Sequence, residues 1–235
     1  RAIAPVFPLG MYALYLQQRV DGVPTRTTFV VLAVAAALAM LAYAAYKVWA
    51  GWDELRKVRL GLEAEMATGE ELNRLMPEGY YVFHDVPGEP SFNIDHVVVG
   101  PTGVYAVETK GRPKRVQEGS DEGHKVYYDG KTLQFPGWRE SQPLKQAGLN
   151  AEWVAKWLSS AVGERVSVTP LLVLPGWYVT RTSAEGMMVL NEKQVRTQVG
   201  RRPTVLTPKQ IQQVAHQLDQ RCRDIEPRAY AKQDS

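Results

Sequence analysis

Two carboxylate side chains and one lysine stand at spacings that would let them hold a divalent cation. Asp95 lies in one β-branched run, and Glu108 stands two residues before Lys110 in the next run. Side chains alternate between the two faces of a strand, so Glu108 and Lys110 share one face. Carboxylate oxygens suit Mg²⁺ or Mn²⁺, and a neighbouring ammonium can orient a water molecule or help to deprotonate it. These residue types therefore suit metal-dependent hydrolysis of a phosphodiester.

The segment between the two runs places the acids opposite each other. Residues 100–103, Gly-Pro-Thr-Gly, are a turn signal between valine-rich runs, which predicts two antiparallel strands. If Val99 pairs with Val104, the register carried backward sets Asp95 opposite Glu108, with Cβ atoms about 5 Å apart. An ordinary cross-strand ion pair at the surface is the alternative interpretation of the same residues.

A third acid is expected from a helix that precedes this hairpin. Residues 59–76 show the periodicity of an amphipathic helix, and Glu65 falls on its apolar side. An inward acid without a partner is costly, so we expect Glu65 to reach the metal site; a salt bridge to a buried basic residue is the alternative. The predicted apolar side consists of Leu62, Met66, Gly69, Leu72 and Met76.

Four short motifs follow one another in an order that is fairly specific. They are Gly-Leu-Glu-Ala-Glu at 61–65, Phe-His-Asp at 83–85, Asn-Ile-Asp-His at 93–96 and Glu-Thr-Lys at 108–110. From about residue 61 to about residue 175 the chain resembles the nuclease-related domain called NERD, which is similar to the PD-(D/E)xK, or restriction-endonuclease-like, superfamily. The resemblance implies a Mg²⁺-dependent nuclease built on a mixed sheet flanked by helices.

The resemblance also implies a role for each matching residue. Asp95 and Glu108 would bind the divalent metal, and Lys110 would stabilise the nucleophile or the developing charge. Glu65 would support the metal from the first helix. Gln146 matches the downstream glutamine of the family and would lie at the edge of the site. The sequence departs from the family pattern at residue 64, where alanine stands in place of the commoner glycine.

Basic residues directly after the motif lysine are candidates for contact with nucleic acid. Arg112, Lys114 and Arg115 would form a phosphate-binding rim, because lysine and arginine displace counterions from nucleic acid. A solvated loop is the alternative, and the net charge of +3 does not decide between the two. DNA is the favoured substrate. A catalytically silent, membrane-tethered module that binds nucleic acid or protein is the alternative function.

The N-terminal part of the chain has the composition of a membrane anchor. Residues 29–46 carry no charge, and interfacial Lys47, Trp49 and Trp52 follow, which predicts a transmembrane helix at about 29–50. Residues 2–16 are shorter and are a candidate for the remainder of a first span, since the chain begins with arginine rather than methionine. We therefore expect an anchor at 1–58, a nuclease-like domain with a C-terminal helix at 59–222, and a flexible tail at 223–235.

Charges beside the apolar segment predict its orientation. Four basic residues follow it and two precede it, which favours a bacterial-type inner membrane protein whose globular domain faces the cytoplasm. The lone Cys222 excludes an intramolecular disulfide and agrees with a reducing compartment.

The remaining segments predict an α/β fold with a restriction-endonuclease-like mixed β-sheet flanked by helices, preceded by one or two transmembrane helices. Helices are expected at 141–160 and from Thr207 onward. Trp153 and Trp157, within the first of these, are assigned to the core or to the membrane-facing side, without a functional role. Strands are expected at 80–86 and 166–174, the second of them central because it is apolar on both faces. Residues 126–133 are expected to form a short strand or a hairpin around Asp129 and Gly130.

Overall fold

The computed structural model describes residues 12, 15–16, 25–89, 92–114 and 123–223. The chain divides into two compact units, residues 1–57 and 58–235. The predicted partial span at 2–16, the basic residue at 115 and the predicted tail from 224 onward lie outside the described residues, residues 12 and 15–16 excepted.

One long helix, α2 (Thr25–Asn73), contributes residues to both units. Among the described helices, α2 alone is long and apolar enough to cross a membrane, judged by its length and by a mean hydropathy of 2.2 over its most apolar window. Aliphatic and aromatic side chains cover this part of α2 and are exposed, among them Leu38, Met40 and Trp49. The structure therefore contains the apolar helix that the sequence predicts.

The second unit is built on a five-stranded mixed sheet with the order β1-β2-β3-β7-β9. The first three strands are antiparallel, whereas β7 and β9 run parallel to β3. Val99 pairs with Val104 and Val97 with Ala106, so the predicted hairpin register is confirmed. The strands are β1 (Tyr81–Pro87), β2 (Asn93–Gly100), β3 (Gly103–Thr109), β7 (Val168–Val173) and β9 (Met188–Leu190).

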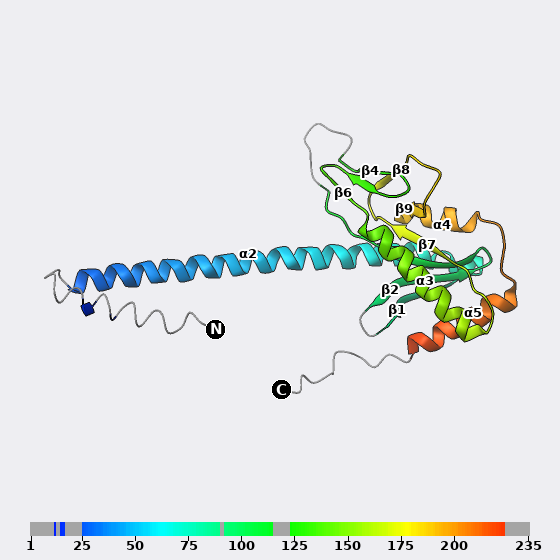
Figure 1. Cartoon of the computed structure of the whole chain (residues 1–235), viewed down its shortest axis with the longest axis horizontal. Helices are drawn as coiled ribbons and strands as arrows, with labels where there is room; N and C mark the ends of the chain where they lie inside the picture. Colours follow the sequence, from blue (N-terminus) through cyan, green and yellow to red (C-terminus); the bar gives the residue numbers. More distant parts are fainter. Residues whose placement is uncertain (1–11, 13–14, 17–24, 90–91, 115–122, 224–235) are drawn as a thin grey trace. The chain divides into compact units, whose positions relative to one another are not determined.

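Helices cover both faces of this sheet, because strands buried on both sides need an apolar partner on each. On one face, α3 (Gln142–Val162) and α5 (Pro208–Arg223) pack on the side chains of β2 and β3; in Figure 1, α3 crosses in front of the sheet. On the other face lie the end of α2 and a short helix, α4 (Glu192–Gly200). The predicted α/β class, with a mixed sheet between helices, is confirmed.

A second sheet of four short strands, in the order β6-β5-β4-β8, was not predicted as a separate unit. Its core contains the stacked rings of Phe135 and Trp138, with the edge of Trp177 against them. Aromatic side chains in this segment therefore pack inside the protein. The strands are β4 (Lys125–Tyr128), β5 (Leu133–Phe135), β6 (Trp138–Glu140) and β8 (Tyr178–Arg181).

The buried side of α2 within the second unit agrees with the predicted one only in part. Gly69 and Leu72 are buried as predicted, whereas Leu62 and Met66 are exposed. The helix ends at Asn73, so the predicted Met76, which is exposed, lies beyond it, as does the buried Leu75. The helix approaches the sheet through small side chains instead, because alanine, threonine and glycine at the contact let two backbones come close. These small residues are Ala64, Thr68 and Gly69.

Candidate functional site

The end of the β2–β3 hairpin brings the predicted acids to one place. The ladder pairs His96 with Val107 and then stops. In place of the next rung, the backbone N–H of Thr109 donates a hydrogen bond of 2.6 Å to Asp95 Oδ2. The Asp95 carboxylate is thus held at the point where β3 ends, directly beside the backbone of Glu108.

Glu108 is the most deeply buried acid of this group, with only 1% of its surface exposed. Lys110 Nζ lies 2.6 Å from Glu108 Oε1, and Asn150 Nδ2 of α3 donates a hydrogen bond of 2.7 Å to Oε2. The predicted placement of Glu108 and Lys110 on one face is therefore observed. Lys110 stays attached to the sheet because its backbone N–H donates to Val173 O at 3.0 Å.

Asn150 was not predicted from the sequence. It is buried on the apolar side of α3, one helical turn after Gln146. A polar residue on an apolar helix face is itself a signal, because a buried amide needs a partner to offset its lost hydration. Its partner, however, lies 42 positions away in the chain.

Three carboxyl groups influence one another at this site. Burial, followed by the neighbouring Asp95, raises the pKa of Glu108 to about 7, although Lys110 opposes the shift. Burial also raises the pKa of Asp95, against the Thr109 N–H and Lys110. The pKa of Glu65 is raised by burial and then by the charge of Asp95. Acids that repel in this way favour a cation between them.

The raised pKa of Glu108 predicts how stability depends on pH. Because the folded pKa is about 7 and the unfolded value is 4.5, the folded state binds this proton more tightly. The contribution of protonated Glu108 to the free energy of unfolding is therefore fully present below pH 4.5 and is lost as the pH rises to about 7. Thermal unfolding in EDTA should show this decline, and the Glu108→Gln variant should show less of it. An unchanged decline in the variant would contradict the assignment.

Glu65 lies on α2 and is half-buried, although only Gly69 and Leu72 of the predicted apolar side are buried on this helix. It makes no ion pair among the described residues, so the alternative of a salt bridge to a buried basic residue is not observed there. The charges of Asp95, Asp85 and Lys110 act on the pKa of Glu65, so its carboxylate lies near the hairpin end.

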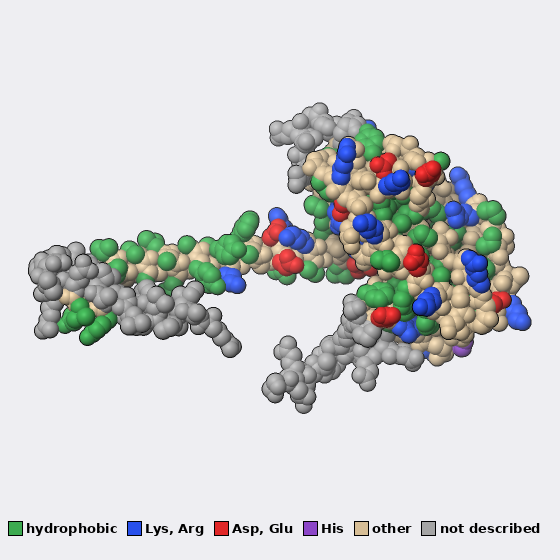
Figure 2. Space-filling model, viewed as in Figure 1, with side chains coloured by type: hydrophobic (Ala, Val, Ile, Leu, Met, Phe, Trp, Pro, Cys, Tyr) green, Lys and Arg blue, Asp and Glu red, His purple; other side chains and the backbone are tan. Residues whose placement is uncertain are grey.

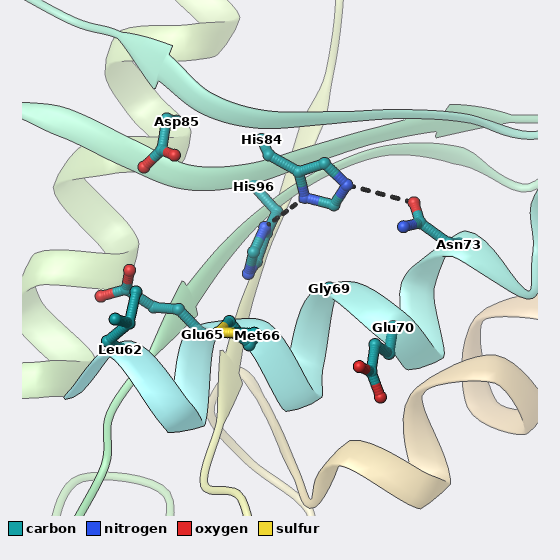
Figure 3. Close-up of a pocket in the computed structure, with 9 residues that line it drawn as sticks. All are labelled: Leu62, Glu65, Met66, Gly69, Glu70, Asn73, His84, Asp85 and His96. Carbon is teal, nitrogen blue, oxygen red and sulfur yellow. Dashed lines mark hydrogen bonds between the residues drawn. The ribbon is translucent and has the colours of Figure 1, made fainter. Parts of the chain in front are cut away.

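Glu65 also lines a cleft of about 260 Å³ between α2 and the first two strands. Figure 3 shows His84 and His96 in this cleft, with their Nδ1 atoms 2.8 Å apart and His84 Nε2 3.1 Å from Asn73 Oδ1. Burial lowers the pKa of His96 to about 4, so this imidazole stays neutral. Asp85, on the same rim, adopts a φ of 50°, a left-handed conformation that aspartate tolerates better than most residues.

The predicted basic rim is arranged differently from the sequence expectation. Arg112 is bound by Glu140 through two contacts, Nε at 2.7 Å and Nη2 at 2.9 Å, and so part of its charge is already neutralised. Lys114 is exposed. Gln146 lines a separate cavity along α3, next to Asn150. Arg115 lies outside the described residues.

A divalent cation fits the chemistry of the hairpin end. Among the described residues, no group of three or more His, Cys, Asp and Glu side chains is arranged to hold a metal. Mg²⁺ does not require one, because it is commonly bound by one or two carboxylates together with waters and phosphate oxygens. Glu108 Oε1 supports this fit: it is buried, and it already contacts a positive charge, the Lys110 ammonium at 2.6 Å.

Gly111 allows α2 to approach this site closely. A Cβ at Gly111 would lie 2.6 Å from Leu60 O and 3.1 Å from Ala64 Cβ, whereas a Cβ at Gly61 would meet nothing within 4 Å. Gly111→Ala should therefore push α2 away from Lys110 and destabilise the protein by about 1–3 kcal/mol. Gly61→Ala is the matched control and should be neutral or slightly stabilising. Chemical unfolding of the two variants measures the difference, and equal stabilities would contradict the contact.

Comparison with known proteins supports the nuclease-related interpretation of this region. Residues 60–175 match the family model for NERD, the nuclease-related domain. This stretch contains the end of α2, the hairpin, α3 and the whole of β7. No curated protein and no solved structure matches the chain.

Proposed function

We propose that this protein is a membrane-anchored, divalent-metal-dependent nuclease of the PD-(D/E)xK type that hydrolyses phosphodiester bonds of DNA. The similarity to the nuclease-related domain supports the general class. The observation that carries the proposal is the gathering of Asp95, Glu108 and Lys110 at the hairpin end, with Glu108 buried and its Oε1 paired with the Lys110 ammonium.

Each side chain has a defined part in this reaction. Asp95 and Glu108 would hold Mg²⁺ or Mn²⁺, with Glu65 in support; the bound cation would polarise the phosphate and lower the pKa of a bound water. Asn150 would keep the Glu108 carboxylate oriented through its hydrogen bond to Oε2. Lys110 Nζ would leave Glu108 Oε1 as the cation arrives and would then hold the attacking water or the negative charge that develops on the phosphate.

The location of the reaction is part of the proposal. The apolar part of α2 would cross the inner membrane of a bacterial-type cell, and the second unit would face the cytoplasm, where DNA and Mg²⁺ are both present. The positive charges that follow the apolar segment support this orientation.

A plasmid cleavage assay tests the function directly. The full chain in detergent micelles should nick plasmid DNA with Mg²⁺ and should not do so in EDTA. Lys110→Met should lower the rate by about a hundredfold, because no ammonium then stabilises the negative charge that develops on the reacting groups. Lys193→Met removes an exposed lysine from α4 and is the matched control, which should cleave normally.

Two results would reject the nuclease. One is the absence of cleavage by the wild-type chain at any Mg²⁺ or Mn²⁺ concentration tested. The other is cleavage that survives unchanged in Lys110→Met. Binding of DNA without cleavage would instead support the alternative function, a silent module tethered to the membrane.

A further inference from the structure

A cavity of about 530 Å³ runs along α3 on the face of the molecule that Figure 2 displays. One wall consists of side chains three or four positions apart on α3, which places them on one side of the helix. These are Gln142, Gln146, Asn150 and Trp153, and Phe92, which contacts Trp153, also lines the cavity. The cavity is large enough for a nucleobase with its sugar.

Asn150 is shared between this cavity and the proposed reaction site. It lines the cavity and also donates the 2.7 Å hydrogen bond to Glu108 Oε2. A group bound in the cavity would therefore lie one side chain away from the proposed metal ligand. A nucleotide is a ligand of that dimension, because its base and its phosphate are separated only by the sugar.

Trp153 is a rigid aromatic surface in this cavity. The edge of Phe92 meets its ring at 84° with the centroids 5.6 Å apart, and Trp157 lies parallel to it at 6.1 Å. The guanidinium of Arg221 is 5.4 Å from the centre of each indole and is itself held by the carbonyl oxygens of Pro87 and Gly88. The indole is thus fixed before any ligand arrives, which lowers the entropic cost of stacking against it.

The surroundings of Trp153 favour a neutral, planar ligand over a phosphate. Leu149, 65% exposed, adds an apolar side chain to the same lining. The charged residues of the lining, Glu152 and Lys156, are of opposite sign. The amides of Gln142 and Gln146 can donate and accept hydrogen bonds at the edge of a base. Figure 2 likewise shows hydrophobic side chains between acidic and basic ones on this face.

We propose that this cavity binds an unpaired base of single-stranded DNA, stacked on Trp153, beside the phosphate that reaches Glu108. This inference rests on the proposed function, and it goes further by naming the strand state of the substrate. A base within a duplex is paired and stacked and cannot enter, whereas a base in a single strand exposes both faces and its edge.

Binding without cleavage tests the inference. The probe is a short single-stranded oligodeoxynucleotide that contains one 2-aminopurine, a base whose fluorescence falls when it stacks. It is mixed with the Glu108→Gln chain in detergent micelles with Mg²⁺. We expect the fluorescence of 2-aminopurine to be quenched. We also expect the chain to bind this strand about tenfold more tightly than it binds the matching duplex, or an oligonucleotide with an abasic site in place of the base. Equal binding of the abasic strand or of the duplex would overturn the inference, and this arm needs no change at Trp153.

Variants then assign the effect to one side chain. Trp153→Ala should abolish the quenching and weaken binding about tenfold, and Trp153→Phe should restore most of both. Tyr178→Ala is the matched control, because it removes an exposed aromatic side chain from β8. Quenching that persists in Trp153→Ala, or that is lost equally in Tyr178→Ala, would contradict the stacking site.

Parallel cleavage assays separate this inference from the proposed function. If the wild-type chain cleaves DNA but binds the abasic strand as tightly as the intact strand, the base-binding proposal is wrong and the nuclease proposal still holds. If the wild-type chain binds the intact strand more tightly than the abasic strand but does not cleave DNA, the nuclease proposal is wrong and the base-binding proposal still holds.

Discussion

The chain with Glu108→Gln is expected to lose about a thousandfold in Mg²⁺-dependent cleavage. That is the effect of removing a ligand charge that contributes about 4 kcal/mol to transition-state stabilisation. Glutamine keeps the size of the side chain and can still accept the hydrogen bond from Asn150. The loss should therefore come from the missing charge at the cation and not from a rearranged core. The initial rate of plasmid nicking measures it.

A stability measurement makes this result specific. Glu108 is buried, and its raised pKa of about 7 means that its ionised form is costly in the metal-free protein. At pH 8, Glu108→Gln should be at least as stable as the wild type in EDTA and should gain less from added Mg²⁺. The matched control is Asp219→Asn, which changes an acid of α5 that pairs with Arg223 and should cleave normally. Normal cleavage by Glu108→Gln would end the proposal for this site.

Leu72→Ala should destabilise the protein by about 2–5 kcal/mol, the range found when a fully buried leucine is truncated. Leu72 is 0% exposed and packs with Leu75, Val98 and Tyr105 on the face of the sheet that α2 covers. Because the same helix carries Glu65, loosening this contact should also lower the apparent affinity for Mg²⁺. Urea unfolding of the full chain in micelles measures the first effect.

Met66→Ala is the matched variant for this prediction. Both residues lie on α2, and the hydrophobic periodicity of the sequence assigns both to the buried side. Met66 is 58% exposed, so its truncation should change the stability by less than about 0.5 kcal/mol. If the two variants were equally destabilised, the helix would have the orientation that the periodicity predicts, and the buried side described for α2 would be wrong.

The contrast between these two residues shows what periodicity can decide. It predicts that a helix is present and that part of it is buried, because both follow from spacing within one segment. It does not decide which of two neighbouring stripes meets the sheet. That choice depends on the small side chains of Ala64, Thr68 and Gly69, which permit close approach to the partner strands.

Contacts between segments distant in the chain account for the other differences between the sequence-based predictions and the structure. Strand β4 pairs in parallel with β8, although Lys125 and Tyr178 are far apart in the chain, so the second sheet could not be predicted from local alternation. The basic rim was predicted from neighbours in sequence, yet Arg112 is held by Glu140 of β6. Likewise, the sequence assigns Trp153 to the core or to the membrane-facing side, whereas in the structure it lines a cavity; a helical pattern does not show which side of α3 borders a cavity.

The sequence by itself determined the hairpin register, and with it the relation of Asp95 to Glu108 and Lys110, because a short turn and a two-residue period leave one pairing that buries the valines. It also determined the apolar helix, since composition alone makes such a segment. Only the tertiary structure decided that Asn150 holds Glu108 and that a cavity with a fixed indole lies beside them. The physical reason is the distance along the chain: local rules act over a few residues, whereas these contacts depend on how a helix packs on a sheet.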